Sequence, residues 1–419
     1  MAPFRTTPKK TSEESFLLKL PNETIASCLP TDLDMLNLAL SCNNLYKRIL
    51  DRKSTIWRSY FGDKYEIPDG RDSGDLMVEY QIRTIVLAQK IDFTEDSHQQ
   101  RLWLDVIQTM LIESLTLPPR SGRASKTFKQ IREAVERVDF LSQPQRRHSS
   151  DIFCAIQLCL TALVLDKLAT GCCLRFEYDI AAVYSYDADI SGPFIDHDAL
   201  DLSSLLHMRN FWQRHILDAH EGTFYFSFAQ LRRDLKPILN SHPEIEDLRG
   251  FQTTWMGYYS CIHPLPRTSE QLQNRQTCAD LDSHWDQVEI MTLTFQTKAD
   301  EFWPEDCNNM IPRYEGPGMK RYFNGIQSVH KSNNNVENPL FGFMEPIAVP
   351  YGGFPGWKRI CFAICEQPKA DQLGILAAGP SPWAHGYEAV IVPGGRAMIG
   401  RWVDLRDPSG RGPFIFWAV

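Results

Sequence analysis

Cysteine is the residue type in this chain whose reactivity and metal affinity could most readily support chemistry. The sequence has 11 cysteines, and its close pairs are Cys154 with Cys159, Cys172 with Cys173, and Cys361 with Cys365. None of these pairs has the C-x2-C spacing of a typical zinc site. Cys361 and Cys365 fall in a predicted strand, where their spacing places them about 13 Å apart, too far for a shared metal ion or a disulfide. We therefore expect buried, reduced thiols and no metal site.

Other patterns imitate functional motifs without completing them. Residues 187–198 carry oxygen-bearing side chains where a calcium loop needs them, but Asp198 replaces the bidentate glutamate at the last position. His215 and His220 do not share a helix face. Residues 316–321 lack the P-loop spacing, and no nucleophile elbow or dinucleotide motif occurs. A cysteine–histidine pair that meets only in the fold stays open, yet no local motif predicts an enzyme, a metal or a cofactor.

The composition is that of an ordinary globular protein, with 43% hydrophobic and 23% charged residues. The net charge is −8 and no basic stripe occurs, which argues against general nucleic-acid binding. The longest apolar run, residues 152–165, is too short to cross a bilayer, and residues 1–15 form a polar tail without the apolar segment of a secretory signal. Scattered cysteines in such a chain favour a cytoplasmic or nuclear location.

The elements that position any function begin with a pattern between Phe16 and Phe61. Pro21 fits the first position of a helix. A second helix start lies at Thr31 and Asp32, and Leu33, Leu36 and Leu40 follow at helical spacing. Two or three short helices of this kind carry more apolar residues than so small a unit can bury. The sequence therefore predicts an apolar face that binds a partner helix or groove.

This pattern resembles the F-box, the module that binds the adaptor Skp1 of cullin–RING ubiquitin ligases. The resemblance implies that six residues contact Skp1: Leu20, Pro21, Ile25, Leu29, Leu33 and Leu36. Skp1 would in turn link the chain to cullin. It implies that Leu45 and Trp57 pack the third helix of the module. The first helix is shorter than is usual in the family. The alternative is a three-helix subdomain that packs only on its own chain.

The rest of the chain divides into two regions by its apolar pattern. Residues 75–245 are mainly helical, although the aromatic and β-branched content of residues 176–186 predicts strand or extended structure. Residues 250–419 show short apolar runs separated by Gly/Pro turns. We therefore predict an α+β chain with an F-box at 16–62, a helical middle region and a C-terminal antiparallel β-barrel or sandwich.

The β-rich region carries a second, weaker resemblance. Residues 255–260 and 286–295 look like the opening of the β-barrel of some F-box receptors, and residues 354–360 and 392–402 are similar to phrases of fungal F-box proteins. In such receptors the barrel recruits the protein to be ubiquitinated. The resemblance thus implies a non-catalytic substrate-recognition subunit of a Skp1–cullin–F-box ubiquitin ligase.

Tryptophan and arginine are the usual anchors of protein recognition. We expect Trp357, Arg359 and Arg396, placed on loops, to contact the target protein. Two other hypotheses stay open. One is a Skp1-bound adaptor outside a ligase; the other is a small-molecule-binding or enzymatic β-barrel, which a deep apolar pocket would favour.

Overall fold

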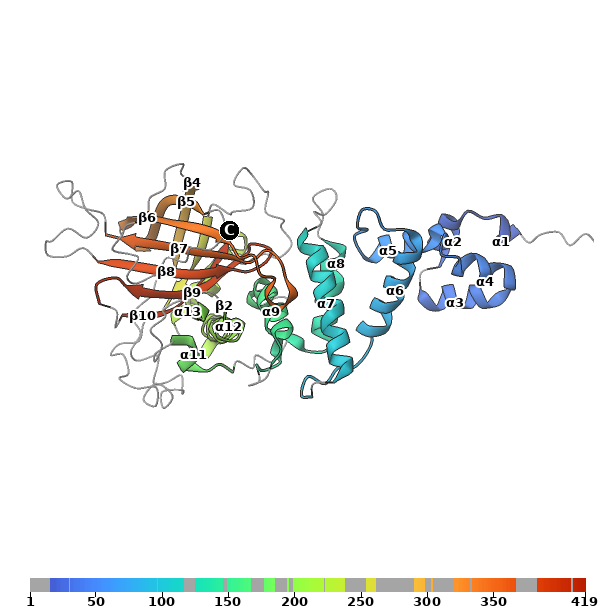
Figure 1. Ribbon diagram of the computed structural model, residues 1–419, viewed down its shortest axis with the longest axis horizontal. Helices are drawn as coiled ribbons and strands as arrows, with labels where there is room; N and C mark the ends of the chain where they lie inside the picture. The colour runs from blue at the N-terminus through green and yellow to red at the C-terminus, as the bar shows by residue number, and fades with distance from the viewer. Residues whose placement is uncertain are drawn as a thin grey trace, which may run out of the picture. The chain divides into compact units, whose positions relative to one another are not determined.

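The computed structural model describes residues 16–29, 31–95, 97–116, 125–145, 149–166, 177–184, 194–195, 199–221, 223–237, 254–260, 290–297, 303, 320–331, 334–366, 383–407 and 410–419. The chain forms two compact units. The N-terminal unit comprises residues 1–89 with 125–130, and the barrel unit comprises residues 90–124 with 131–419. A helical region followed by a closed antiparallel barrel confirms the predicted α+β class (Figure 1).

Short helices make up the N-terminal unit. They are α1 (Phe16–Lys19), α2 (Asn22–Cys28), α3 (Asp32–Ser41), α4 (Asn43–Leu50), α5 (Thr55–Lys64) and α6 (Ser73–Leu87). Thr31 begins α3 with a capping box, because its hydroxyl accepts from the Asp34 N–H at 3.1 Å and its own N–H donates to the Asp34 carboxylate at 3.2 Å. Arg48 ties α4 to the start of the unit through the Asn22 side chain at 2.7 Å and the Leu18 carbonyl at 2.9 Å.

The helices of the middle region are α7 (His98–Thr116), α8 (Lys126–Arg137), α9 (Asp151–Cys159), α10 (Thr161–Leu165), α11 (Ile180–Tyr184), α12 (Leu202–Leu217) and α13 (Thr223–Gln230). Among the described residues, no helix is long and apolar enough to span a membrane.

One prediction for this region is wrong. Residues 176–186 were expected as strand or extended structure, but Ile180–Tyr184 forms α11. The Asp179 side chain accepts the Ala181 N–H at 2.9 Å and starts the helix, and the Arg401 guanidinium donates to the carbonyls of Ala182 and Val183 at its end. These tertiary contacts override the β preference of the local sequence.

Eight strands close into an antiparallel barrel in the order β10-β3-β4-β5-β6-β7-β8-β9. They are β3 (Thr254–Tyr259), β4 (Met291–Thr297), β5 (Arg321–Lys331), β6 (Asn334–Pro346), β7 (Lys358–Cys365), β8 (Ala384–Ile391), β9 (Ala397–Asp404) and β10 (Arg411–Ala418). A further short pair, β1 (Phe194–Ile195) and β2 (Ala199–Leu200), lies outside the barrel sheet. The last strand, β10, closes the barrel by pairing with both β9 and β3.

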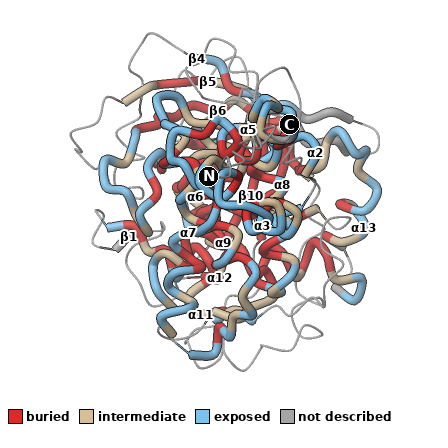
Figure 2. Tube along the Cα trace, turned by 90° about the vertical axis from the view of Figure 1, so that its right-hand side faces the viewer, coloured by how far each residue is buried: buried red, intermediate tan, exposed pale blue. Residues whose placement is uncertain are grey.

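Side chains fill the interior of the barrel. Alternate residues of each strand point inward, and they include Trp255, Phe295, Phe362, Tyr387 and Phe414, each at most 1% exposed. The strands also approach closely: a Cβ at Gly257 would lie 2.0 Å from the Ile415 carbonyl oxygen, so only glycine fits there. Buried residues accordingly run along the barrel strands and α12 (Figure 2).

Helices cover part of the outer face and one end of the barrel. Helix α12 contacts β9 and β10, and α11 contacts β10. The connection between β6 and β7 forms the short helix η5 (Tyr351–Gly353), which packs on α9. The Gln108 amide of α7 donates to the Gly352 carbonyl at 2.7 Å. This end of the barrel is therefore held against the helices of its own unit.

Candidate functional site: an exposed leucine stripe and a pocket

Helix α3 exposes three leucines along one side. Leu33, Leu36 and Leu40 are 64%, 54% and 67% exposed, and we call them the leucine stripe. Met35 and Ala39 of the same helix face the core of the unit and are buried. The helix thus has apolar residues on two sides, of which one is buried in the unit and the other is exposed. A run of exposed large side chains on a well-capped helix is typical of a surface that binds another protein.

The structure places the six predicted Skp1 contacts in three classes of exposure. Pro21, Leu33 and Leu36 are exposed, and Leu20 and Leu29 are half-buried. Ile25 is only 3% exposed and lies in the core of the N-terminal unit. Leu45 and Trp57 are buried, as the resemblance implied. Leu40 extends the stripe, and its helical spacing from Leu33 and Leu36 was the signal for it.

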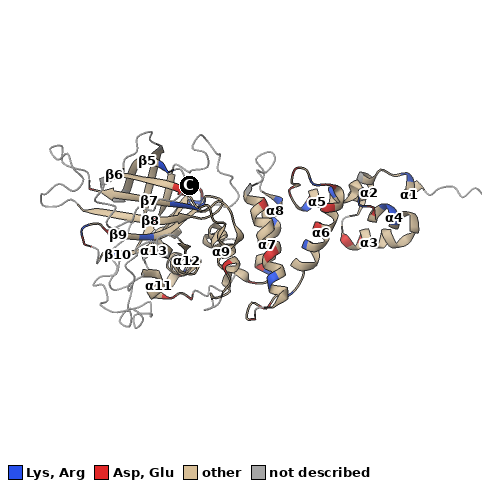
Figure 3. Ribbon diagram, viewed as in Figure 1, with Lys and Arg blue, Asp and Glu red and all other residues tan. Residues whose placement is uncertain are grey.

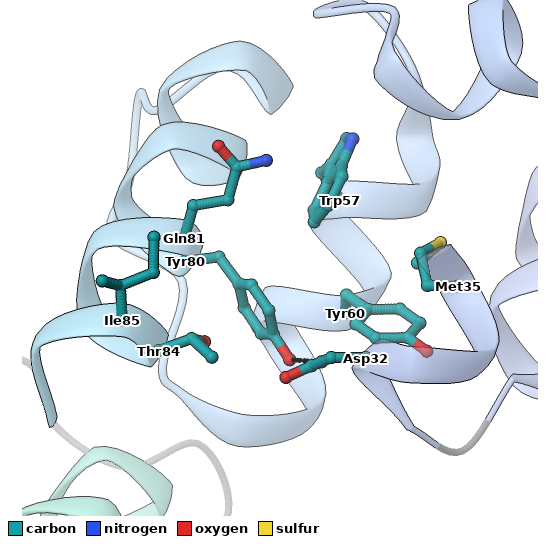
Figure 4. A pocket seen from close by; sticks show the side chains of 8 residues that line it. All are labelled: Asp32, Met35, Trp57, Tyr60, Tyr80, Gln81, Thr84 and Ile85. Carbon is teal, nitrogen blue, oxygen red and sulfur yellow. Dashed lines mark hydrogen bonds between the residues drawn. The ribbon is translucent and has the colours of Figure 1, made fainter. Parts of the chain in front are cut away.

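A pocket of about 140 Å³ lies in the same unit (Figure 4). Its lining comes from α3, α5 and α6 and consists of Asp32, Met35, Trp57, Tyr60, Tyr80, Gln81, Thr84 and Ile85. The three aromatic rings are buried, whereas Ile85 at the rim is 63% exposed. Sequence reasoning missed this pocket, because half of its lining belongs to α6, outside the predicted F-box.

Hydrogen bonds fix the aromatic walls of the pocket. The Trp57 indole donates to the Ile49 carbonyl at 2.6 Å, and the Tyr80 hydroxyl donates to Asp32 Oδ1 at 2.5 Å. The Tyr60 hydroxyl contacts the backbone carbonyls of Leu29 and Thr31. Burial, together with the charge of Asp32, raises the pKa of Tyr60 to about 12 and that of Tyr80 further still. Both phenols therefore stay neutral near pH 7.

The predicted target-binding residues of the β domain have different environments. Trp357 is fully buried, and its indole donates to the Tyr351 carbonyl at 3.1 Å. Arg359 was expected on a loop, but it lies in β7 and is 2% exposed. Its Nε donates to Glu388 at 2.8 Å, so its guanidinium is used inside the fold. Arg396 lies between β8 and β9 and is half-buried, and this burial lowers its pKa.

Arg359 belongs to a row of charges on the outer side of the barrel. Glu345 pairs in register with Arg359, and Glu388 with Arg401, so that acidic and basic residues alternate over β6, β7, β8 and β9. Figure 3 shows basic residues in blue on β7 and β9. All four are buried, and the Phe194 ring lies 4.9 Å from the Arg359 guanidinium. Arg401 also donates to the carbonyls of Ala182 and Val183 in α11, so the row contacts segments outside the barrel sheet.

Aromatic residues gather at the barrel end opposite η5. The His385 ring lies 4.9 Å from Trp383 and 4.7 Å from Trp402, between centroids, and Tyr259 lies 5.4 Å from Trp402. Burial lowers the pKa of His385 to about 4, although Asp404 opposes the effect, so this imidazole is neutral near pH 7. This end carries the partly exposed rings of Tyr259 and Trp383.

Two of the predicted features concern cysteines and metal ligands. Cys361 and Cys365 are buried in β7, and burial raises the pKa of both thiols. No group of acidic, histidine and cysteine side chains in the described ranges is arranged to hold a metal ion. The calcium-like loop at 187–198 falls outside the described residues except for Phe194 and Ile195. Comparisons with protein-family models, curated proteins and solved structures found no match to this chain.

Proposed function

We propose that this protein is a substrate-recognition subunit of a Skp1–cullin–F-box ubiquitin ligase. The observation that supports it is the leucine stripe: Leu33, Leu36 and Leu40 stand exposed on a helix that is capped and anchored on its other side. Two of these three residues are ones that the F-box resemblance assigns to the Skp1 contact. An exposed apolar face of this kind is what an F-box would need in order to bind Skp1, and this supports the proposal.

The physical case for docking rests on burial of the stripe. Each leucine that passes from water into a well-packed groove contributes roughly 1.5–3 kcal/mol. Three such residues supply enough free energy to offset part of the entropy lost on association. The resemblance assigns Ile25 to the Skp1 contact, but this residue is buried within the unit. It would instead hold α2 in place beneath the exposed residues.

The barrel unit would bind the target protein. A solid, closed barrel is a rigid support for a binding surface, and its end opposite η5, with Tyr259, Trp383 and His385, offers aromatic side chains suited to recognition. The subunit would have no catalytic residue of its own. Its effect would be to raise the effective concentration of target lysines near the ubiquitin-loaded enzyme of the ligase.

The composition of the complex in cells tests this proposal. Tagged full-length chain should retain Skp1 and cullin, and Leu33→Asp/Leu36→Asp should lose both, because each new carboxylate would be desolvated in the contact. The matched control is Val349→Asp, since Val349 is 53% exposed in the connection between β6 and β7. Skp1 without cullin would instead identify an adaptor outside a ligase. Absence of Skp1 from folded wild-type chain would contradict the F-box assignment.

A further inference from the structure

The pocket of the N-terminal unit is lined by aromatic residues that the proposed contact with Skp1 does not involve. Three aromatic rings form its inner wall, with centroid separations of 6.4 Å for Trp57–Tyr60, 6.0 Å for Trp57–Tyr80 and 5.8 Å for Tyr60–Tyr80. The ring planes are inclined to one another by 55–74°. The rings therefore meet as neighbouring walls instead of one flat stack (Figure 4). The negative faces of such rings attract a cation.

A carboxylate lies beside these rings. Asp32 is the one charged residue of the lining, and the Tyr80 hydroxyl orients its Oδ1. The chain itself shows what this arrangement attracts: the Lys64 ammonium lies 4.9 Å from the Tyr80 ring centroid and 3.5 Å from Asp32 Oδ2. Lys64 and Asp32 are both about two-fifths exposed, at 40% and 42%. An ion pair so exposed is weak, so another cation can displace Lys64 at small cost.

We propose that the pocket is a binding site for methylated ammonium groups, the chemistry shared by choline and by the side chain of trimethyllysine. The lining is mostly apolar, and a bare ammonium placed inside could direct only part of its N–H donors to Asp32, leaving the others facing the rings. A quaternary ammonium has no N–H group, and its methyl groups match the faces of Trp57 and Tyr80. A pocket of about 140 Å³ is close to the size of the engineered cavity of about 150 Å³ that holds one benzene ring.

Calorimetric titration of the full chain tests the site. The probes are choline and the neutral alcohol in which carbon replaces the choline nitrogen. Choline should bind saturably and at least about fivefold more tightly than the neutral alcohol, because only the cation gains from the rings and the carboxylate. A second titration compares a peptide bearing trimethyllysine with the same peptide bearing lysine. Tighter binding of the trimethyllysine peptide than of choline would identify a protein ligand, and the reverse order a small molecule.

Two variants change affinity in opposite directions. Asp32→Asn keeps an acceptor for the Tyr80 hydroxyl but removes the charge, and it should lower choline affinity about fivefold. Lys64→Met removes the competing ammonium and should raise the affinity a few-fold, whereas Lys47→Met, at an exposed lysine of α4, should leave it unchanged. Equal affinity for choline and the neutral alcohol, no saturable binding to the folded chain, or no gain in Lys64→Met would each overturn the proposal. None of these readouts depends on Skp1.

Discussion

Arg359 lies between two buried carboxylates on the outer side of β7. Its Nε is 2.8 Å from Glu388 Oε1, and its Nη1 is 3.5 Å from Glu345 Oε1. Arg359→Met should destabilise the barrel unit by about 3–5 kcal/mol, because it leaves two buried acidic groups without their cation. Denaturant unfolding, followed by tryptophan fluorescence, measures the loss.

The control for that change is Arg406→Met at an exposed position after β9, which should alter stability by less than about 0.5 kcal/mol. If Arg359→Met unfolds at the same denaturant concentration as wild type, the charged row does not stabilise the barrel.

His385 should make the stability of the barrel unit depend on pH. Its pKa is about 4 in the fold, because burial disfavours the cation, and about 6.5 in the unfolded chain. Between these values the unfolded state binds more protons, so stability falls as the pH drops from about 6.5 toward about 4. His385→Phe keeps a ring between Trp383 and Trp402 but cannot titrate. Melting temperatures across this range should fall less steeply in the variant, and identical slopes would show that His385 is not the titrating group.

At the scale of elements, the capping box of α3 supports the leucine stripe. Thr31→Ala removes the acceptor for the Asp34 N–H and should cost about 1 kcal/mol of helix stability. Hydrogen exchange at the α3 amides should become faster. Thr24→Ala, at an exposed threonine within α2, is the control and should leave exchange in α3 unchanged. Unchanged exchange in Thr31→Ala would mean that packing alone fixes α3.

Strand β10 closes the barrel, and its removal should open it. Deleting residues 414–419 takes away the pairing with Gly257 and neighbouring residues of β3 and with Ile399 and neighbouring residues of β9. Two strand edges and the barrel interior would then meet water, so we expect loss of cooperative unfolding and aggregation. Deleting Val419 alone is the control. A melting temperature equal to that of the full chain after the larger deletion would show that β10 is not integral.

Strands and helix starts with strong local signals could be predicted from the sequence. The Gly/Pro turns expected in residues 250–419 include Gly394 and Gly395, which lie between β8 and β9, and Thr31 marked the start of α3. Helix α11 could not be predicted, since Arg401, distant in the sequence, binds the carbonyls at its end. Closure into a barrel, as opposed to a sandwich, depends on the pairing of β10 with β3, which no local pattern encodes.

The candidate site was predictable only where it depends on local sequence, and not where it depends on contacts between distant residues. Leu33 and Leu36 were identified by spacing and resemblance, and both are exposed. Arg359 was assigned by residue type alone, and the sequence did not reveal that Glu388 lies opposite it in the sheet. Arginine and glutamate inside apolar strand runs were the available signal for that pairing. The pocket joins Asp32 to Tyr80 over 48 positions, a contact that only the fold creates.

At the scale of the whole molecule, each compact unit carries its own proposed role. The N-terminal unit presents the leucine stripe, and the barrel unit provides a rigid domain whose end opposite η5 carries aromatic side chains. This division predicts that changes in the stripe abolish Skp1 binding and leave the fold of both units intact. The stripe residues are exposed, so their loss should not alter the melting temperature measurably.

The most direct measurement is calorimetric binding of purified full-length chain to purified Skp1. The F-box assignment predicts saturable binding at one Skp1 per chain. It also predicts at least about a hundredfold loss in Leu33→Ala/Leu36→Ala/Leu40→Ala, because each change removes most of the roughly 1.5–3 kcal/mol that burial of a leucine contributes. Wild-type chain that is folded and does not bind Skp1, or a triple variant that binds as tightly as wild type, would contradict the F-box assignment.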